Sequence, residues 1–292
     1  MHRKTIENWF ILLILSIIWG SSFILMKKGL ISFTYLEVSF FRLIIAFLVL
    51  SPFLLSSLKN MKMRYILPIL IVSIIGTVIP AVLFAFGQTH LNSSTTGMLN
   101  ALTPIFTLLV GVFIFEKKWN KEKIIGVIIG LLGSYILLLP SSFKMMDTKY
   151  SLIIILATMC YAISINTIKE KLKGLTSLDI AVLSSFMSFL IPFIFVLNNG
   201  ITKTTSHIYN NIESFYYLII LGTICTSIAI ILFNYLIKRS SALFGSTTTY
   251  LIPIFAIVWG LVDNESIESH EFLGLLIILA GVFIMNYNQL EL

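Results

Sequence analysis

Hydroxyl and amide side chains recur along one apolar segment beside a proline. Spacings of 4, 3 and 4 residues place them on one face of a helix: Thr96, Asn100, Thr103 and Thr107. Pro104 removes a backbone hydrogen bond and should kink that helix, leaving the carbonyl of Asn100 free. Such a face offers hydrogen bonds to a solute, or to a neighbouring helix as packing glue. This polar face therefore predicts non-covalent binding through hydrogen bonds.

A second segment repeats this arrangement. Pro253 follows Pro104 by 149 residues (253 − 104), inside LIPIF where the first segment reads LTPIF. Ser246, Thr249 and Tyr250 precede it, and the freed carbonyl would belong to Thr249. Because both segments set a polar face beside the same proline, we favour a cavity lining over helix–helix glue. A glutamate follows each proline by twelve residues: Glu116 and Glu265.

Arg42 is the one charged residue well inside an apolar segment. Charges inside membrane helices are costly, so they pair with a counter-charge or face a cavity. The guanidinium could bind a substrate carboxylate or phosphate. Pairing with Glu37, a carbonyl or a lipid phosphate stays open. Lys27 and Lys28 end the first apolar run and are expected to reach the membrane interface.

Aromatic residues make up 13% of the chain and could wall a pocket for an amphipathic organic solute. Trp19 and Tyr161 are the main candidates because they occupy matching positions in the two halves of the sequence, beside small residues. Packing is an equally weighted alternative. The further candidates for this pocket are Ser21, Phe23, Tyr250, Asn166 and Asn234.

Motifs of catalysis and of ATP use are missing. The sequence has no G-x-x-x-x-G-K-[ST] and no G-x-S-x-G, and HEFLG at 270–274 lacks the second histidine of H-E-x-x-H. Cys160 and Cys225 lie in apolar stretches and indicate buried thiols, with neither a disulfide nor a metal site. We therefore expect no enzymatic activity, no cofactor and no metal.

The whole chain must hold these residues within a lipid bilayer. Hydrophobic residues make up 58% and charged residues 11%, and the mean hydropathy is +0.98. Soluble domains carry about 25% charged residues, so this composition predicts an all-α polytopic membrane protein. The net charge of +7 falls in short loops and therefore indicates membrane orientation, with no nucleic-acid partner.

Ten segments are apolar and long enough to be spanning helices. They are approximately 9–28, 34–55, 66–88, 94–115, 122–140, 150–168, 177–197, 214–237, 242–262 and 270–288. The first lacks an A-x-A-like cleavage site and predicts a true span. Loops on the side of both termini carry 14 lysines and arginines, against five on the other side. This asymmetry predicts cytoplasmic termini in the cytoplasmic membrane.

The segments form two five-span repeats, expected over residues 9–140 and 150–288. GVIIGLLGSYIL (126–137) matches GLLIILAGVFIM (274–285), with glycines seven residues apart that predict close helix packing: Gly126, Gly133, Gly274 and Gly281. Because five is odd, the second repeat should enter the membrane from the opposite side. EKKWNKEK (116–123) carries four lysines and DNESIESHE (263–271) none, which agrees. Inverted repeats are typical of transporters whose substrate site lies between the repeats.

Several of these stretches together resemble a known family. WGSSF (19–23), FFRLIIAF (40–47), LTPIFTLLVGVFIFE and LIPIFAIVWGLVDNE are similar to the drug/metabolite transporter superfamily, in particular to its ten-span proteins with two EamA domains. The resemblance covers about residues 9–288. It implies a helical carrier with a central cavity lined by spans 1, 3, 4, 6, 8 and 9, and with spans 5 and 10 at the periphery. Similar four-span carriers exchange protons through a glutamate in the first helix, and spans 1 and 6 here contain no Asp or Glu.

Three hypotheses for function follow. The first is an exporter of amino acids or similar small metabolites, since many relatives have that activity, working by alternating access as a monomer, with a dimer left open. The second is an importer or exchanger of anionic metabolites such as phosphorylated sugars, which a cluster of cavity cations would favour. The third is a lipid-handling protein, which predicts a lateral opening between helices.

Overall fold

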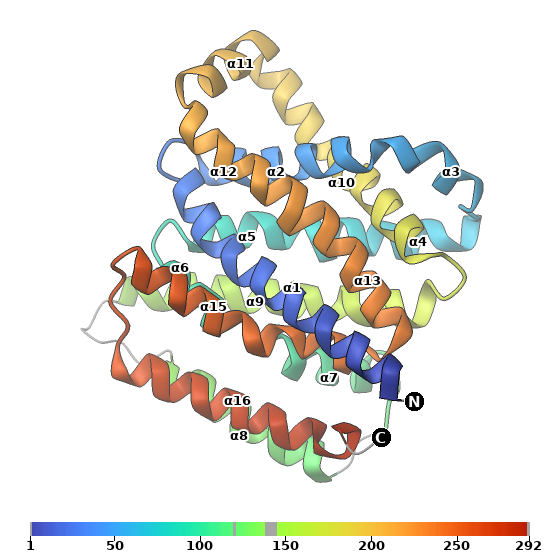
Figure 1. The fold of residues 1–292 in the computed structure, drawn as a ribbon, viewed down its shortest axis with the longest axis vertical. Coiled ribbons are helices and arrows are strands. Elements are labelled where there is room, and N and C mark those ends of the chain that lie inside the picture. The colour runs from blue at the N-terminus through green and yellow to red at the C-terminus, as the bar shows by residue number, and fades with distance from the viewer. Residues whose placement is uncertain (1, 119–120, 138–144, 291–292) are drawn as a thin grey trace.

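The computed structural model describes residues 2–118, 121–137 and 145–290, and every regular element in these ranges is a helix (Figure 1). The amino-terminal half contains α1 (His2–Gly29), α2 (Tyr35–Leu50), the 3₁₀-helix η1 (Ser51–Phe53), α3 (Leu54–Lys59), α4 (Met63–Ser73), the π-helix η2 (Ile74–Val78), α5 (Ile79–Gly87), α6 (Ser93–Asn100), α7 (Thr103–Phe113) and α8 (Lys121–Leu137). The carboxyl-terminal half contains α9 (Met145–Lys171), α10 (Ser177–Asn199), α11 (Ile201–Asn210), α12 (Ile212–Gly222), the π-helix η3 (Thr223–Ile228), α13 (Ala229–Arg239), α14 (Ala242–Ser246), α15 (Thr248–Val262) and α16 (Ser269–Leu290). The expected all-α class is confirmed for the described chain.

Eight helical segments of the described residues are long and apolar enough to cross a membrane. They are Ile6–Gly29, Tyr35–Lys59, Met63–Gly87, Ser93–Phe113, Thr148–Lys171, Ser177–Asn199, Ile212–Arg239 and Ala242–Val262. The other two expected spans correspond to α8 and α16, which hold the shorter apolar stretches Ile124–Gly133 and Ser269–Gly281. The chain is a multi-pass membrane protein, and a count of ten crossings stays a prediction.

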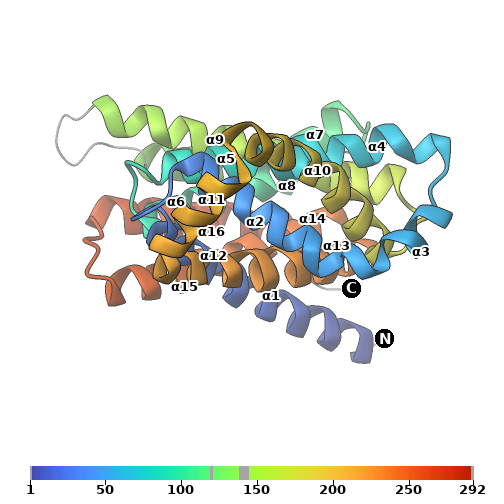
Figure 2. The ribbon, with the colours of Figure 1, turned by 90° about the horizontal axis from the view of Figure 1, so that it is seen from above.

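The first helix of each half packs against helices of the other half. Helix α1 contacts α12, α13 and α15, whereas α9 contacts α4, α5 and α7. Seen from above, these two groups form two layers with α1 and α9 on opposite sides (Figure 2). This exchange buries one shared apolar core between the halves, which includes Met26, Met98, Ile154 and Ile252. Polar side chains that face this region can therefore come together from both halves.

The two proline segments are broken helices, and the breaks lie N-terminal to the prolines. Helix α6 ends at Asn100 and α7 begins at Thr103, so Pro104 lies in the first turn of a new helix, where its missing N–H costs little. Pro253 lies inside α15, and the break comes six residues earlier, at Thr247 (253 − 247).

The prediction of a free carbonyl at Asn100 is wrong. The Thr103 hydroxyl donates to that carbonyl at 2.8 Å. Around the second break, Ser246 and Thr249 donate to carbonyls three residues earlier, at 2.7 and 2.8 Å. Short hydroxyl side chains thus satisfy backbone acceptors that a membrane interior leaves without water.

Helices α8 and α16 pack side by side at the edge of the molecule (Figure 1). A Cβ at Gly133 would lie 2.6 Å from the backbone nitrogen of Ile278 and 2.8 Å from the carbonyl oxygen of Gly274. A Cβ at Gly281 would lie 2.6 Å from the carbonyl oxygen of Gly126. Glycine at these positions lets the two backbones approach more closely than any side chain would allow.

Candidate functional site

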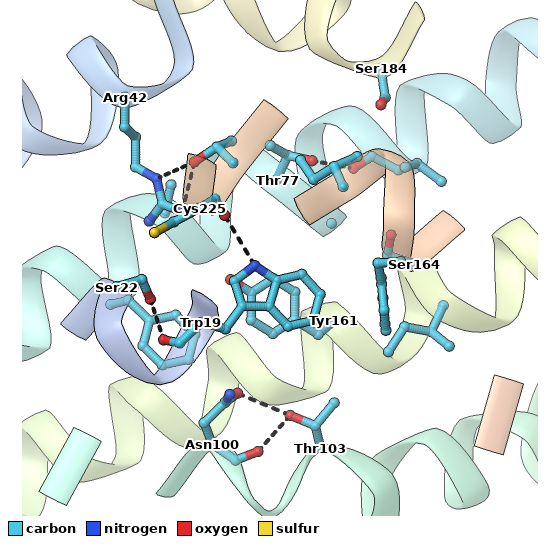
Figure 3. Close-up of a pocket in the computed structure, with 18 of the residues that line it drawn as sticks. Trp19, Ser22, Arg42, Thr77, Asn100, Thr103, Tyr161, Ser164, Ser184 and Cys225 are labelled. Atoms are coloured by element: carbon cyan, nitrogen blue, oxygen red, sulfur yellow. Dashed lines mark hydrogen bonds between the residues drawn. The ribbon is translucent and has the colours of Figure 1, made fainter. Parts of the chain in front are cut away.

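A cavity of about 120 Å³ lies between the two halves (Figure 3). On this measure a single water molecule needs roughly 10–15 Å³, so the cavity can hold several waters or a small solute. Its lining comes from all the spans that the resemblance implied and also from α2 and α10. Within the described residues, α8 and α16 contribute nothing to the lining.

Eight of the residues predicted for a substrate site line this cavity: Trp19, Phe23, Arg42, Asn100, Thr103, Tyr161, Asn234 and Thr249. They come from seven different helices, which shows that the fold gathers residues separated by up to 230 positions (249 − 19).

Four other predicted residues lie outside the cavity. The Ser21 hydroxyl bonds to Ile17 and accepts from Trp259 on the outer side of α1. Thr96 is fully buried and donates to the carbonyl of Asn92. The remaining two are Asn166 and Tyr250.

Asn166 joins two helices. Its amide donates to the carbonyl of Thr107 at 2.9 Å and to that of Ala162 at 3.0 Å, and its oxygen accepts from Lys117 at 3.1 Å. This is the helix-glue role that the sequence left open. Tyr250 is partly buried and packs against the central apolar core.

Two aromatic pairs face the cavity in matching positions. Trp19 packs edge-on against Phe233 with ring centroids 4.8 Å apart, and Tyr161 stacks on Phe84 at 5.6 Å. Tyr161 follows Trp19 by 142 residues (161 − 19), and Phe233 follows Phe84 by 149 (233 − 84). The indole N–H of Trp19 also donates to the carbonyl of Cys225 at 3.0 Å, which fixes the ring at the cavity wall.

The two π-helices were not predicted from the sequence. Both η2 and η3 line the cavity, and each contains a threonine whose hydroxyl donates to the carbonyl five residues earlier: Thr77 to Val72 at 3.1 Å, Thr226 to Leu221 at 2.8 Å. The two threonines are 149 residues apart (226 − 77), like the prolines. In the sequence, each π-helix is marked only by a small residue followed by a threonine in the middle of a span. π-Helical segments within α-helices occur frequently at functional sites.

Arg42 points its guanidinium at Thr226. Both Nε and Nη2 donate to the Thr226 hydroxyl oxygen, each at 3.2 Å. The alternative partner, Glu37, instead caps α2 with Thr34 and contacts His207 at 3.1 Å. No Asp or Glu of the described chain lines the cavity. The cavity therefore contains a positive charge without an acidic partner in its walls.

Asn100, Thr103 and Thr249 supply the neutral polar groups of the cavity. Thr103 donates to the carbonyl of Asn100 and approaches its side-chain oxygen at 3.2 Å. In Figure 3, Asn100 and Thr103 lie on one side of Trp19 and Tyr161, and Arg42 lies on the other. A solute in the cavity would meet a charged pole, aromatic walls and a hydrogen-bonding pole.

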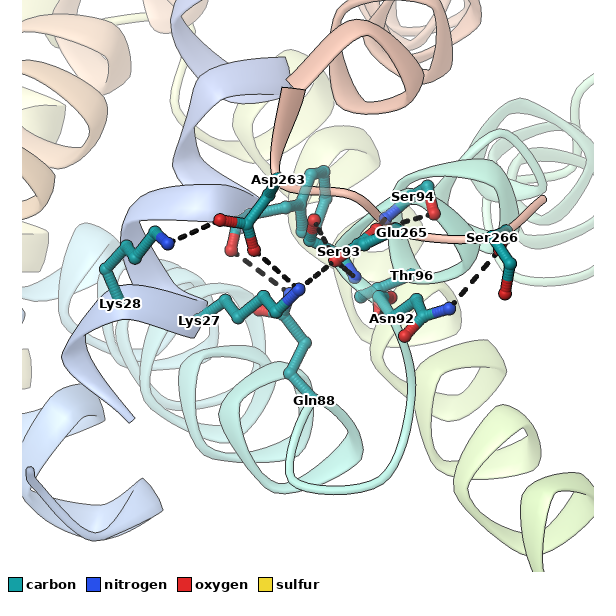
Figure 4. A network of polar contacts seen from close by, with 11 residues as sticks. Lys27, Lys28, Gln88, Asn92, Ser93, Ser94, Thr96, Asp263, Glu265 and Ser266 are labelled. Atoms are coloured by element: carbon teal, nitrogen blue, oxygen red, sulfur yellow. Dashed lines mark hydrogen bonds and ion pairs between the residues drawn. The ribbon is translucent and has the colours of Figure 1, made fainter. Parts of the chain in front are cut away.

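A second polar cluster joins the end of α1, the start of α6 and the loop after α15 (Figure 4). Lys27 contacts both Asp263 and Glu265 at 2.7 Å, and Lys28 contacts Asp263. The two lysines are thus ion-pair partners of the loop that follows α15. That they reach the membrane interface stays a prediction. We call this group, together with Ser93 and Ser94, the end cluster.

Glu265 is the centre of the end cluster. Its side chain is 2% exposed and accepts from the backbone N–H groups of Ser93 and Ser94 at 2.9 and 3.0 Å, and from their hydroxyls at 2.8 and 2.7 Å. A carboxylate from the second half thereby caps the N-terminus of α6. Burial alone would raise the pKa of Glu265, but hydrogen bonds from Lys27, Ser94 and Ser93 outweigh it and lower the pKa to about 2. Glu116 is exposed, with a left-handed φ of 53°.

The sequence profile of the EamA-like transporter family matches residues 8–139 and 148–287. An uncharacterized transporter of Buchnera aphidicola is 26% identical over 264 residues, covering 88% of this chain and 85% of that protein. An uncharacterized inner membrane transporter of Escherichia coli, YedA, is 26% identical, and the match covers 98% of this chain and 93% of that protein. A probable terminal-alkyne amino-acid exporter of Streptantibioticus cattleyicolor is 21% identical, and the match covers 95% of this chain and 93% of that protein.

A solved crystal structure of another protein has a similar fold. It superposes with a TM-score of 0.68 at 12% sequence identity, over 98% of this chain and 99% of the other. At that identity the likeness concerns the fold alone.

Proposed function

The chain belongs to the EamA-like transporter family, and on this premise we propose that it exports amino acids or similar small metabolites across the cytoplasmic membrane by alternating access. Family membership makes it a transporter and not an enzyme. The observation that carries the finer proposal is the cavity between the halves, with one guanidinium, aromatic walls and neutral hydrogen-bonding groups. Such a mixture suits a small amphipathic solute.

We further propose that ten spans form two inverted repeats, residues 9–140 and 150–288, with α8 and α16 as spans 5 and 10 and both termini cytoplasmic. Matched features support this: the aromatic pairs, the π-helices, and capping boxes at Thr34–Glu37 and Thr176–Asp179. The reciprocal packing of α1 and α9 on the opposite halves is what a pseudo-two-fold axis through the cavity would produce.

Alternating access would rock one repeat against the other around this cavity. The end cluster ties α1 to the loop after α15 and to the start of α6, so it would hold one end of the cavity closed. In the proposed orientation that end is external. The breaks before Pro104 and Pro253 are the proposed hinges, because a discontinuous helix can bend with little loss of backbone hydrogen bonds.

The proposed substrate contacts are the eight cavity residues given above. Support for amino acids comes from the Streptantibioticus relative, whose name describes an amino-acid exporter. The alternative, exchange of anionic metabolites such as phosphorylated sugars, has one supporting observation, the unpaired Arg42. The described lining contains no second cation to match a phosphate dianion.

Metabolite profiling of the medium tests the proposed function. Cells that overproduce the protein should release one or a few amino acids or related metabolites above the level of cells with an empty vector. Asn100→Ala should lower that release by roughly 10-fold, the loss expected for one hydrogen bond to a bound polar solute. Asn199→Ala, the same change at an exposed residue outside the cavity, should leave it unchanged.

Membrane levels of the variants are compared by immunoblot. A medium that does not differ from the empty-vector control would overturn the proposed transport. Equal release by Asn100→Ala and Asn199→Ala would remove Asn100 from the site.

A further inference from the structure

Arg42 is the one ionised side chain that the described chain places on the cavity wall. A guanidinium stays protonated in proteins, and a charge in a low-dielectric site is costly unless a counter-charge meets it. Its protein partner, Thr226, is neutral. The missing counter-charge is therefore a property to expect of the solute.

Thr226 occupies one edge of the guanidinium. Of the five N–H donors of an arginine, Nε and one on Nη2 point at the Thr226 hydroxyl oxygen, which in turn donates to the Leu221 carbonyl. The opposite edge, formed by Nη1 and the second N–H of Nη2, has no hydrogen bond to the described protein. Two parallel N–H groups on one edge match the two oxygens of a carboxylate.

The charge balance favours a carboxylate over a phosphate monoester. One guanidinium neutralises one carboxylate, whereas a phosphate monoester carries about −1.5 to −2 at neutral pH. The surplus negative charge would lie among aromatic rings and hydroxyls, with no second cation in the described lining.

Only one half of the cavity carries this charge. The capping boxes of α2 and α10 are 142 residues apart (176 − 34), and the same offset relates Arg42 to Ser184, which also lines the cavity. Ser184 is neutral and donates to the carbonyl of Ala181. A pseudo-symmetric cavity with a single charged pole binds an asymmetric solute in one orientation.

We infer that the substrate carries one carboxylate, which binds the free edge of Arg42, while its organic body lies along Trp19 and Tyr161 towards Asn100 and Thr103. This inference rests on the proposed transport function and specifies its substrate class. In an amino acid, the ammonium group would meet aromatic faces, which attract cations. Thr226 acts as a positioning residue because its hydroxyl oxygen holds the other edge of the guanidinium.

The test compares binding of matched carboxylates and carboxamides to the purified full-length protein. The probes are acetate, benzoate, 3-phenylpropanoate and phenylalanine, each paired with its carboxamide, and phenyl phosphate. Binding is followed as the rise in melting temperature with probe concentration, at constant pH and ionic strength. At least one carboxylate should bind, and its carboxamide should bind roughly 10- to 100-fold more weakly, since it loses a charge-assisted hydrogen bond.

Arg42→Gln should abolish the preference for carboxylates over carboxamides. Arg42→Lys should retain part of it, because a lysine keeps the positive charge but lacks the two parallel N–H donors of a guanidinium. Arg64→Gln is the matched control, because Arg64 is exposed outside the cavity and contacts Tyr65. Thr226→Val keeps the charge at residue 42 and should weaken carboxylate binding, so it serves if Arg42→Gln does not purify as a folded protein.

The inference is overturned if no carboxylate of the set binds, if carboxamides bind equally well, if phenyl phosphate binds more tightly than benzoate, or if Arg42→Gln keeps the preference. An exported metabolite without a carboxylate would overturn it and leave the transport proposal intact. Carboxylate binding without any change in the medium would support the site and reject export.

Discussion

At the scale of single residues, Glu265 joins three separate parts of the molecule. One carboxylate receives the ammonium of Lys27 and four donors from Ser93 and Ser94, and so links α1, α6 and the loop after α15. An acidic side chain can accept this many bonds only when ionised. Its low pKa follows from those donors and makes its contribution to stability independent of pH over the physiological range.

We expect Glu265→Gln to destabilise the protein by about 2 kcal/mol, since it removes the charge from a buried charge-assisted network. The pKa of Glu265 lies at about 2 in the folded protein against an ordinary 4.5, so its stabilisation is complete above pH 4.5 and declines as the pH falls towards 2. The difference in melting temperature between wild type and variant should therefore be constant from pH 8 to 5.5 and shrink below pH 4.5.

Glu268→Gln, in the same loop but exposed, provides the control and should change the melting temperature little. A difference between wild type and Glu265→Gln that already disappears between pH 7 and 6 would contradict the assigned ionisation.

The sequence located the polar residues but not all of their partners. Periodicity identifies side chains that share a helix face, and two side chains of the predicted face, Asn100 and Thr103, line the cavity. It could not separate them from Thr96, because the chain breaks after Asn100 and the face of α6 before the break turns to protein. The ion pairs of Lys27 were not foreseeable, because its partners come 236 and 238 residues later (263 − 27 and 265 − 27).

At the scale of elements, hydropathy gave the helices and their order, whereas the irregular parts follow from hydrogen bonding. A π-turn changes the register of the backbone ladder without changing the apolar character of the segment, so η2 and η3 leave only a weak trace in the sequence. Proline correctly marked a discontinuity in two spans. The breaks themselves lie N-terminal to the prolines, where hydroxyl groups of Thr103 and Ser246 donate to backbone carbonyls.

The close contact of α8 and α16 gives a prediction at this scale. Gly133→Ala should lower stability by about 1–3 kcal/mol, because the added methyl meets the backbone of Ile278 and Gly274, which cannot move aside alone. Gly130→Ala is matched in chemistry and in helix propensity. Its methyl would meet the terminal carbon of Ile105, a side chain that can rotate.

Thermal unfolding of the two variants, measured side by side in the same detergent, should place Gly133→Ala clearly below Gly130→Ala. Equal melting temperatures would argue that the two helices separate easily. Because no described residue of α8 or α16 lines the cavity, carboxylate binding per folded protein should be the same in both variants.

At the scale of the whole molecule, the opposite orientation of the two repeats is the property that most needs a direct measurement. Lys121 begins α8 and Ser269 begins α16, at equivalent positions 148 residues apart (269 − 121), and both are exposed. In the proposed topology, a membrane-impermeant maleimide should label Ser269→Cys on intact cells. Lys121→Cys should react only after permeabilisation.

The natural cysteines, Cys160 and Cys225, are buried, so unmodified protein should show no labelling on intact cells and provides the background. Reaction of both introduced cysteines from the same side would contradict inverted repeats.

The single positive charge of the cavity also has an electrical consequence. With a monocarboxylate that has no ammonium group bound, the cavity of the carrier is neutral. With nothing bound, or with an amino-acid zwitterion bound, it carries the charge of Arg42. A membrane voltage exerts about 2.3 kcal/mol per elementary charge per 100 mV, so it would act on the empty carrier more than on the carrier loaded with such a carboxylate. In a cell that is negative inside, that force favours the inward return of the empty site, so the resting voltage would drive export of a carboxylate without an ammonium group and leave export of a zwitterion unaffected.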